Sequence, residues 1–518
     1  MIPGIAVAAG AVHGAAFGAG QPAYLQFGGV ALFGALLFRL RAARRWGLLG
    51  MCIAGFWLAS NACGLRWMAG AITGDQVLGV ALGGVVYGFL CLGLSVLTVA
   101  SLWAAVRLSA PLHHDALCCA FYSSAILAAE LLHESVLPSF PWLFVGYAQL
   151  DSPFAVLFPF LGVEGLSWVV LFAELLVGAA GAYIAARRRT PVVTLVSLML
   201  VCSAVALAVR EAPTLTRDAG TLRAAVMQTA MPGKQKFKAT LLGRHIMEIG
   251  DFTRNHDAQL IVTPETAVPT TLRALTPAQE QYLAHGITAS RALLFGAFAE
   301  DSRGDVFNSA VMLQQGAGPT PQVERTVYIK QHLAPIGEYA PPGFQWIADL
   351  LNLPMSNLRS TDDSPRNFRL LGVTIIPSVC QDLLYGGDLR TIVDGPRLLV
   401  NLSNVEFFND ALARAQFLNI ARARALEQQV PVLIAANYGP TAYIDAQSVV
   451  RQQLPSAAID ALEVTVRMRA GITPYARYGR VFLYLMFLLT SVAIAGAAWR
   501  HRLGSLGRHH AKLAAAAG

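Results

Sequence analysis

The chain has 518 residues, of which 55% are hydrophobic and only 14% are charged, and its formal net charge is +8. Soluble domains are typically about 25% charged, so the composition excludes a protein that is soluble along its whole length. The basic residues cluster just after apolar runs. This placement argues against a nucleic-acid surface as the reason for the positive charge and is typical of membrane topology signals.

Apolar runs account for most of the first 209 residues and return near the C-terminus. A helix that crosses a bilayer needs roughly 20 mostly apolar residues. The first run is short and rich in Gly and Ala, and we interpret it as a retained helix because a signal peptide would begin with basic residues. The sequence therefore predicts an α-helical transmembrane bundle of about eight spans, seven of them within residues 1–209. The candidate spans are residues 4–20, 24–40, 47–70, 78–106, 115–133, 155–184, 191–209 and 481–499.

The basic clusters predict how this bundle is oriented. They follow the second, fourth, sixth and eighth runs, whereas the loops at 71–77 and 134–154 contain no Lys or Arg. Loops rich in Lys and Arg stay in the cytoplasm. We therefore expect both termini inside, residues 210–479 outside as a separate domain, and residues 480–518 as a final span with a basic cytoplasmic tail.

Residues 210–479 are more polar and alternate between two periodicities. Short buried or alternating runs predict strands, and apolar positions recurring every three or four residues predict helices. This mixture favours an α/β domain built in layers. The expected strands are 222–229, 258–264, 293–299, 308–314, 323–330, 369–379, 397–403, 430–436 and 462–468, and the expected helices are 236–255, 277–291 and 411–429.

The loop at 134–154 contains prolines that discourage a straight helix, together with several aromatic residues. Its aromatic residues include Phe140, Trp142, Phe144 and Tyr147. We interpret the segment as an interfacial loop that contacts lipid or the outer domain. An ordinary aromatic belt at the membrane surface is the alternative interpretation.

Cys380 is the only cysteine between residues 210 and 479, and it directly follows a strand-like run. Glu265 and Lys330 also stand at the ends of expected strands. A cysteine nucleophile needs a nearby base or a lowered pKa. Glu265 is suited to accept the thiol proton, Lys330 to stabilise an oxyanion, and Glu338 to hold the lysine or share the base role. Structural roles for each residue, such as an inert buried cysteine, remain as alternatives.

Several segments of the sequence resemble the nitrilase superfamily, and in particular its membrane-bound branch, the apolipoprotein N-acyltransferases. The resemblance extends over nearly the full chain. The matching segments are Thr-Pro-Glu-Thr-Ala-Val-Pro (263–269), Phe-Asn-Ser (307–309), Tyr-Ile-Lys-Gln-His-Leu-Ala-Pro-Ile-Gly-Glu-Tyr (328–339), Val-Cys-Gln-Asp (379–382), Ala-Arg-Ala-Arg-Ala-Leu-Glu (421–427), Thr-Pro-Tyr-Ala-Arg-Tyr-Gly (473–479), the aromatic segment 140–153 and Gly-Val-Glu-Gly (162–165).

The resemblance implies a nitrilase-like αββα sandwich for residues 210–479 and a catalytic Glu265–Lys330–Cys380 triad supported by Glu338. It implies that Cys380 takes an acyl chain from a membrane phospholipid as a thioester. The acyl chain then passes to the N-terminal amino group of diacylglyceryl-cysteine in an apolipoprotein. Such an enzyme lies in the bacterial inner membrane with its catalytic domain on the periplasmic side.

Residues in the matching segments are also expected to contact substrate, and these are Trp142, Tyr147, Asn308 and Asp382. The phospholipid donor and the apolipoprotein acceptor are the only partners expected, without nucleic acid, and we expect a monomer. No cofactor is expected. His113, His114, His509 and His510 lack Cys or acidic residues at metal-ligand spacing, so no metal is expected either.

The sequence departs from the family pattern beside the nucleophile and in the expected lipid pocket. Gln381 and Asp382 stand where the family usually has Tyr and Glu, and Phe237 stands where Trp is common. The residues after Asn404 are Val405, Glu406, Phe407 and Phe408, where the family usually has Asp followed by Trp-Phe. The rival interpretations are a divergent paralogue with another acyl acceptor, a membrane-anchored amidase or nitrilase, and a transporter or lipid-binding protein with an inactive outer domain.

Overall fold

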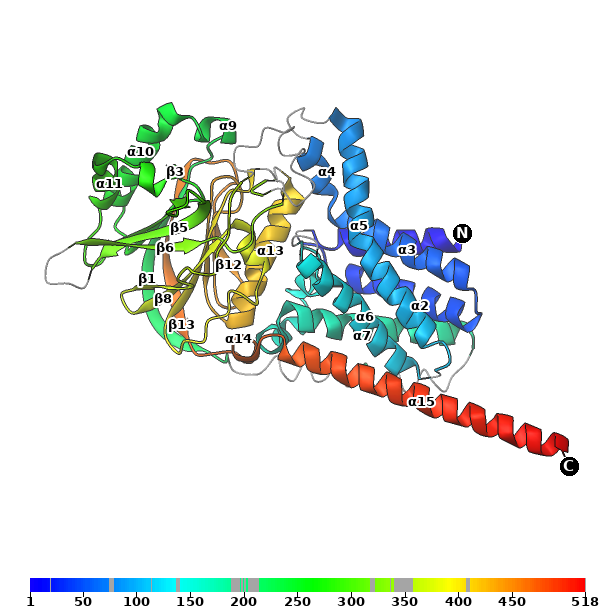
Figure 1. Ribbon diagram of the computed structural model, residues 1–518. Coiled ribbons are helices and arrows are strands. Elements are labelled where there is room, and N and C mark those ends of the chain that lie inside the picture. Colours follow the sequence, from blue (N-terminus) through cyan, green and yellow to red (C-terminus); the bar gives the residue numbers. More distant parts are fainter. Residues whose placement is uncertain are drawn as a thin grey trace. The chain divides into compact units, whose positions relative to one another are not determined.

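A computed structural model represents the protein (Figure 1) and describes residues 1–18, 20–73, 79–112, 114–136, 140–187, 214–316, 322–335, 337–339, 357–406 and 410–517, with a few single residues between 196 and 203. The chain forms two compact units. The helical unit comprises Met1–Ala212 and Tyr478–Gly518, and the sandwich unit comprises Pro213–Arg477.

The helical unit contains six helices that are long and apolar enough to cross a membrane, counted over the described residues. They confirm the expected transmembrane bundle, and the figure of about eight spans is approximate. The first expected span is the short helix α1, which measures about 21 Å at 1.5 Å per residue, and the expected span 191–209 lies outside the described residues. The helices are α1 (Ile2–Ala15), α2 (Ala23–Ala42), α3 (Trp46–Gly64), α4 (Arg66–Thr73), α5 (Gly79–Leu108), α6 (Asp115–Val136), α7 (Phe158–Ala185) and α15 (Val481–Ala517), with short 3-10 turns η2 (Val145–Gln149) and η3 (Pro153–Leu157).

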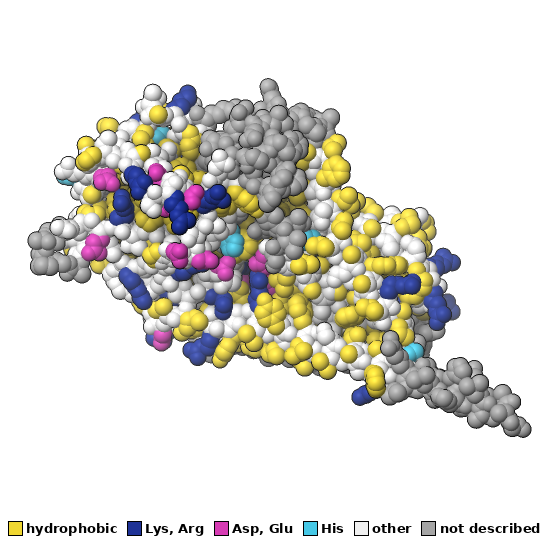
Figure 2. Space-filling view, viewed as in Figure 1, with side chains coloured by type: hydrophobic (Ala, Val, Ile, Leu, Met, Phe, Trp, Pro, Cys, Tyr) yellow, Lys and Arg dark blue, Asp and Glu magenta, His cyan; other side chains and the backbone are white. Residues whose placement is uncertain are grey.

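Glycines let the helices of this unit approach one another closely. A Cβ atom added to Gly10 in α1 would collide with the backbone of Phe56 in α3, and one added to Gly178 in α7 would collide with the backbone of Ala31 in α2. Small residues at helix crossings are typical of membrane bundles. Large apolar side chains such as those of Phe89 and Leu489 stay exposed, and Figure 2 shows hydrophobic side chains over much of the visible face of the helices.

Helix α7 is interrupted near its start by Gly162, whose φ of 66° and ψ of −179° are not helical. Two residues later, Glu164 is almost fully buried and its carboxylate lies 2.9 Å from the guanidinium of Arg480. The same guanidinium lies 2.8 Å from the carboxylate of Glu134 in α6. The expected Gly-Val-Glu-Gly segment thus supplies one half of an ion pair with the residue that precedes α15.

The sandwich unit consists of β-strands with helices on the outside. Neighbouring strands follow the order β12-β11-β10-β9-β13-β1-β2-β4-β5-β6, with β3 beside β4 and the β7–β8 hairpin beside β9. Only the pair Arg469 and Arg397 joins β13 to β9. The described strands therefore form two sheets that meet at this edge.

The strands of the first sheet are β1 (Arg217–Gln228), β2 (Leu260–Val262), β3 (Val268–Thr271), β4 (Ala292–Glu300), β5 (Val306–Gln315), β6 (Val323–Ile329) and β13 (Asp460–Ala470). Those of the second are β7 (Phe368–Leu370), β8 (Val373–Val379), β9 (Arg397–Ser403), β10 (Val432–Ala436), β11 (Ala442–Ile444) and β12 (Val450–Gln453). The other elements are α9 (Gly233–Lys236), η4 (Ala239–Leu241), α10 (Leu242–Asn255), η5 (Leu272–Ala274), α11 (Pro277–Ala284), η6 (Cys380–Leu384), α13 (Ala411–Gln428) and α14 (Pro474–Tyr478).

Alternate residues of each strand face opposite layers, as the two-residue period of a strand requires. Val226 and Leu294 of the first sheet pack with Ile375 and Val400 of the second in one core between the sheets. Ala225, on the other face of β1, belongs to a second core beneath α10 and α11. Helix α13 covers the second sheet (Figure 1). This arrangement confirms the expected αββα sandwich.

Several expected elements differ in detail. The expected strand 369–379 is a hairpin, because Leu371 and Gly372 take positive φ values of 49° and 80° and turn the chain between β7 and β8. The expected helix 277–291 ends at Ala284. Strands β3, β11 and β12 are short, and the apolar periodicity did not predict them.

Candidate active site

The expected catalytic residues stand where several strands end. Glu265 follows β2, Lys330 follows β6, and Cys380 follows β8. Strands β8 and β9 run parallel, as do β2 and β4. Carboxyl ends of parallel strands lie on one edge of a sheet, so side chains that are far apart in sequence meet there.

The turn that carries Glu265 is held in an unusual conformation. Thr266 has a φ of 48°, which is uncommon for a residue other than glycine. The turn lies directly against β4, and a Cβ added to Gly296 would lie 2.6 Å from the Pro264 carbonyl oxygen. The backbone carbonyl of Glu265 accepts a hydrogen bond of 2.7 Å from the ammonium of Lys236. These contacts fix the direction in which the Glu265 side chain points.

Two buried carboxylates share one lysine and one amide. The Lys330 ammonium lies 3.2 Å from Glu265 Oε1 and 2.7 Å from Glu338 Oε2. Asn308 Nδ2 donates to the same two side chains, at 2.7 Å to Glu265 and 2.6 Å to Glu338. Glu338 Oε2 also accepts from the backbone N–H of Ala334. The two carboxylates, the lysine and the amide therefore form one connected cluster.

Burial by itself lowers the pKa of the Lys330 ammonium, but the carboxylates of Glu265 and Glu338 more than offset this and hold the pKa well above its usual value. The lysine is therefore a permanent cation at neutral pH. The pKa of the Cys380 thiol is also raised, but a raised pKa keeps a thiol neutral. Burial raises its pKa, the Glu265 carboxylate raises it further, and the Lys330 ammonium acts against both. The resting residue is thus a neutral thiol at neutral pH.

Cys380 occupies a sharp corner at the junction of β8 and η6, with a φ of 48°. Asn401 in β9 donates its side-chain amide to the Cys380 carbonyl oxygen at 3.1 Å and to Ser378 Oγ at 2.9 Å. The backbone N–H of Asn404 donates to Glu265 Oε2 at 2.9 Å, and its hydrogen bond to Cys380 also acts to lower the thiol pKa. Asn404 therefore links the cysteine to the carboxylate.

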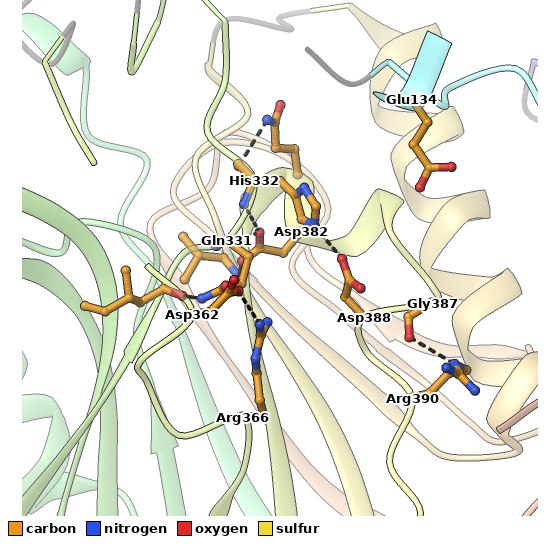
Figure 3. Close-up of polar contacts among 12 residues, drawn as sticks. Glu134, Gln331, His332, Asp362, Arg366, Asp382, Gly387, Asp388 and Arg390 are labelled. Atoms are coloured by element: carbon orange, nitrogen blue, oxygen red, sulfur yellow. Dashed lines mark hydrogen bonds and ion pairs between the residues drawn. The ribbon is translucent and has the colours of Figure 1, made fainter. Parts of the chain in front are cut away.

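Asp382, which was expected to contact substrate, accepts hydrogen bonds from other residues of the protein. Its Oδ2 accepts from the Tyr328 hydroxyl at 2.9 Å and from the Val379 backbone N–H at 3.1 Å. Its Oδ1 accepts from the backbone N–H groups of Gln331 and His332. The side chain is 2% exposed, and Figure 3 shows it beside the Gln331–His332 segment. These hydrogen bonds give Asp382 a positioning role, since they tie the loop after Lys330 to the corner at Cys380.

The neighbouring polar residues extend this connection toward solvent. Gln381 Nε2 donates to the His332 carbonyl oxygen at 3.1 Å. The His332 ring stacks on Tyr385 and its Nε2 lies 2.7 Å from Asp388 Oδ2, a pair that is labelled in Figure 3. Gln381 therefore fills the position of the usual Tyr with a contact to the same loop.

Trp142 and Tyr147, the other two expected substrate contacts, lie in the helical unit and are 3% and 4% exposed. The Trp142 ring lies 5.2 Å from that of Trp67 and 5.3 Å from that of Phe140, centroid to centroid. The Tyr147 ring lies 6.2 Å from that of Phe144. Both residues therefore belong to aromatic clusters, and their contact with lipid stays a prediction.

Two participants were not predicted from the sequence. Lys236 lies near Phe237, a position noted only for the missing Trp, and Asn404 was noted only as part of a divergent segment. Asn404 makes its contact through a backbone N–H, and a pattern of side chains cannot predict such a contact. Glu406 of the same segment accepts from the Gly233 backbone N–H at 2.9 Å, and Phe407 and Phe408 lie outside the described residues.

The αββα sandwich with a cysteine at the end of a central strand defines a carbon-nitrogen hydrolase domain, and the family model described as "Carbon-nitrogen hydrolase" matches residues 223–468. A second model, described as "Apolipoprotein N-acyltransferase N-terminal domain", matches residues 9–176 in the helical unit. Together with the relatives below, these matches show that the chain belongs to the apolipoprotein N-acyltransferase family, as its motifs predicted.

The chain is similar over most of its length to proteins named apolipoprotein N-acyltransferase. The protein from Photobacterium profundum is 33% identical over 374 residues, which cover 71% of each chain. The protein from Ralstonia nicotianae is 31% identical over 512 residues, which cover 97% of this chain and 94% of the relative. The similarity thus includes both the helical unit and the sandwich unit.

Proposed function

We propose that this protein is a membrane N-acyltransferase that moves an acyl chain from a phospholipid to the N-terminal amino group of diacylglyceryl-cysteine in apolipoproteins. The observation that carries the proposal is Cys380, which occupies a constrained corner and whose thiol interacts electrostatically with a buried lysine that two carboxylates hold. Membership of the family supports the choice of reaction. The helical unit supplies the apolar surface that an enzyme acting on membrane-anchored substrates needs.

In the first step, the Cys380 sulfur attacks the ester carbonyl of the phospholipid while Glu265 accepts the thiol proton. The raised pKa of the thiol supports this order of events, because a neutral thiol must lose its proton as it attacks. Lys330 donates a hydrogen bond to the oxyanion of the tetrahedral intermediate. The lysophospholipid leaves as an alcohol with the proton from Glu265, and the acyl chain stays on sulfur as a thioester.

In the second step, the neutral α-amino group of the apolipoprotein attacks the thioester carbonyl. Glu265 accepts a proton from the nitrogen, Lys330 again stabilises the oxyanion, and the amide product forms as the sulfur leaves. The sulfur regains a proton from Glu265, so the enzyme returns to its starting state. Glu338 and Asn308 keep Lys330 and Glu265 in place during both steps through the hydrogen bonds described above.

The topology predicted from the basic loops completes the proposal. Residues 210–479 are assigned to the periplasmic side of the bacterial inner membrane, where lipid-anchored apolipoproteins are available, and the chain acts as a monomer. Trp142 and Tyr147 are assigned to the support of the lipid-binding region. Both substrates share the membrane plane, so an anchored site increases the frequency of encounter.

The test uses the purified full-length chain in detergent with a phospholipid that carries a labelled acyl chain. We expect a labelled protein whose acyl group hydroxylamine releases, and no label on Cys380→Ala. Addition of a diacylated lipopeptide should move the label to the peptide amine. Labelling of Cys380→Ala would refute the assigned nucleophile, and hydrolysis of small amides without transfer to the lipopeptide would favour an amidase.

A further inference from the structure

We propose that Lys236 is a second lysine of the active site, a positioning residue that balances the buried negative charge around Cys380 and holds the turn that carries Glu265. This inference deepens the proposed function, on which its catalytic meaning rests. It concerns a residue outside the Glu265–Lys330–Cys380 triad and outside Glu338.

The geometry places the Lys236 side chain inside the site. The residue ends the short helix α9 and is 3% exposed. Its ammonium donates a hydrogen bond of 2.7 Å to the backbone carbonyl of Glu265, next to Thr266 with its φ of 48°. A cation bonded to this carbonyl keeps the turn in its strained conformation. The ammonium also interacts electrostatically with Cys380 and Glu406.

The charges of the buried site explain why a second cation is useful. Glu265, Glu338 and Asp382 are three buried carboxylates, and Lys330 is a single ammonium among them. Carboxylates near a thiol oppose formation of a thiolate. Without Lys236 this group would hold three acidic side chains against one cation, and with Lys236 it holds three against two.

The other titratable groups that face Lys236 do not replace this charge. Glu406, whose side chain is partly exposed, adds negative potential and accepts from the Gly233 backbone N–H. The His245 ring interacts with the Lys236 backbone, and burial lowers the pKa of the ring. His245 is therefore neutral at neutral pH, and Lys236 stays the additional cation.

Burial lowers the pKa of the Lys236 ammonium to about 8, while Glu265, Glu406 and Cys380 act in the opposite direction. The lysine is therefore mostly charged at pH 7 and loses its charge as the pH rises through about 8. The lowering of the Cys380 thiol pKa by this ammonium should disappear over the same pH range. This gives the inference a signature in pH that a purely structural lysine would lack.

The experiment measures the rate at which iodoacetamide alkylates Cys380 in the full-length chain between pH 6 and pH 10. The peptide that contains Cys380 is quantified by mass spectrometry, because six other cysteines are present. Three variants are compared with the natural chain. Lys236→Met removes the charge, Lys236→Arg keeps it at every pH, and Lys238→Met removes a charge from an exposed position of the same segment as a control.

We expect Lys236→Met to slow alkylation about 10-fold at pH 7, which corresponds to a rise of about one unit in the apparent thiol pKa. The natural chain and Lys236→Met should converge above about pH 9, since the pKa of the lysine is about 8. Lys236→Arg should keep the faster rate without that convergence, and Lys238→Met should match the natural chain.

A Lys236→Met chain that melts earlier but shows an unchanged pH profile would overturn the inference. If Lys236→Met fails to fold, the comparison of Lys236→Arg with the natural chain decides, because identical profiles above pH 8 would also overturn it. Alkylation needs no lipid substrate. The alkylation profile of Lys236→Met could be shifted in a protein that never takes label from phospholipid. That result would refute the proposed acyl transfer and leave the role of Lys236 intact.

Discussion

The ammonium of Lys330 lies 3.2 Å from the carboxylate of Glu265, and these two side chains are only 1% and 7% exposed. A buried ion pair of this kind contributes little to stability, because desolvation of both charges offsets their attraction. The ion pair instead contributes to the chemistry of the site. The pair presents a base and a permanent cation to one sulfur, and the opposite effects of the two charges on the Cys380 thiol lead to the first prediction.

Replacement of Glu265 by Gln should separate thiol acidity from catalysis. Burial and the Glu265 carboxylate both raise the thiol pKa, so removal of this carboxylate should lower that pKa and speed alkylation of Cys380 at pH 7. Formation of the acyl-thioester should nevertheless fall about 10²- to 10⁴-fold, since the proton acceptor is lost. Glu280→Gln, an exposed carboxylate, serves as control. Equal losses in alkylation and in thioester formation would contradict the assignment of Glu265 as base.

Replacement of Asp382 by Asn should weaken the sandwich unit. An amide has one acceptor oxygen, whereas the Asp382 carboxylate accepts four hydrogen bonds, three of them from backbone N–H groups. Leaving buried donors unsatisfied costs about 1–3 kcal/mol each, so thermal unfolding should occur several degrees lower and acyl transfer should fall with it. Asp388→Asn, at an exposed carboxylate, should change the melting temperature little. An unaltered melting temperature in Asp382→Asn would refute the positioning role.

Replacement of Arg480 by Met should destabilise the helical unit. Glu164 is 2% exposed, and its carboxylate would lose the guanidinium that lies 2.9 Å away. An unpaired buried charge costs about 3–5 kcal/mol. The melting temperature in detergent should drop clearly, and Glu164→Gln added to Arg480→Met should restore part of the loss. Arg477→Met removes an exposed arginine three residues earlier as a control. A double variant no more stable than Arg480→Met would argue against this ion pair as the cause.

The stability of the folded chain should depend on Lys236 between about pH 8 and pH 10. The folded pKa of Lys236 is about 8, below the value of about 10.4 in an unfolded chain. Between these values the unfolded state binds more protons, so the contribution of this lysine to stability rises with pH. The difference in unfolding free energy between Lys236→Met and the natural chain should change by about 3 kcal/mol from about pH 7 to about pH 10.4. Melting curves of both chains across this range provide the measurement. A difference that is constant with pH would show that the folded pKa is not lowered.

The motif residues show which features of the active site could be predicted from the sequence. Glu265 and Lys330 were expected to meet because each stands at the end of a strand-like run, and Glu338 was expected to hold the lysine or share the base role. Ion pairs join Lys330 to both carboxylates in the fold. Asn308 was selected from a matching segment as an expected contact of the substrate, and that contact stays a prediction. Its amide proves to bridge the two carboxylates. Residue type and strand position were visible in the sequence, whereas the partner of each side chain depends on strand order.

Asp382 and Lys236 show where the sequence was insufficient. A carboxylate two residues after a nucleophile is as compatible with substrate binding as with the support of a loop. The four donors from the chain itself support the second role, and contact of Asp382 with substrate stays a prediction. Lys236 is one of three lysines at positions 234, 236 and 238, and their spacing does not distinguish it from the other two. Its side chain enters the site because α9 lies beside the Glu265 turn, which is 29 residues away in the chain.

By itself, the sequence determined the division into apolar spans and an α/β domain, because hydrophobic periodicity records burial directly. It also determined the family, because the residues around Cys380 occur as contiguous motifs. Only the tertiary structure decided which carboxylates share Lys330, which backbone N–H faces the sulfur, and which lysine holds the base. These relations join residues that lie on different strands, and their distances are set by sheet order and packing rather than by spacing along the chain.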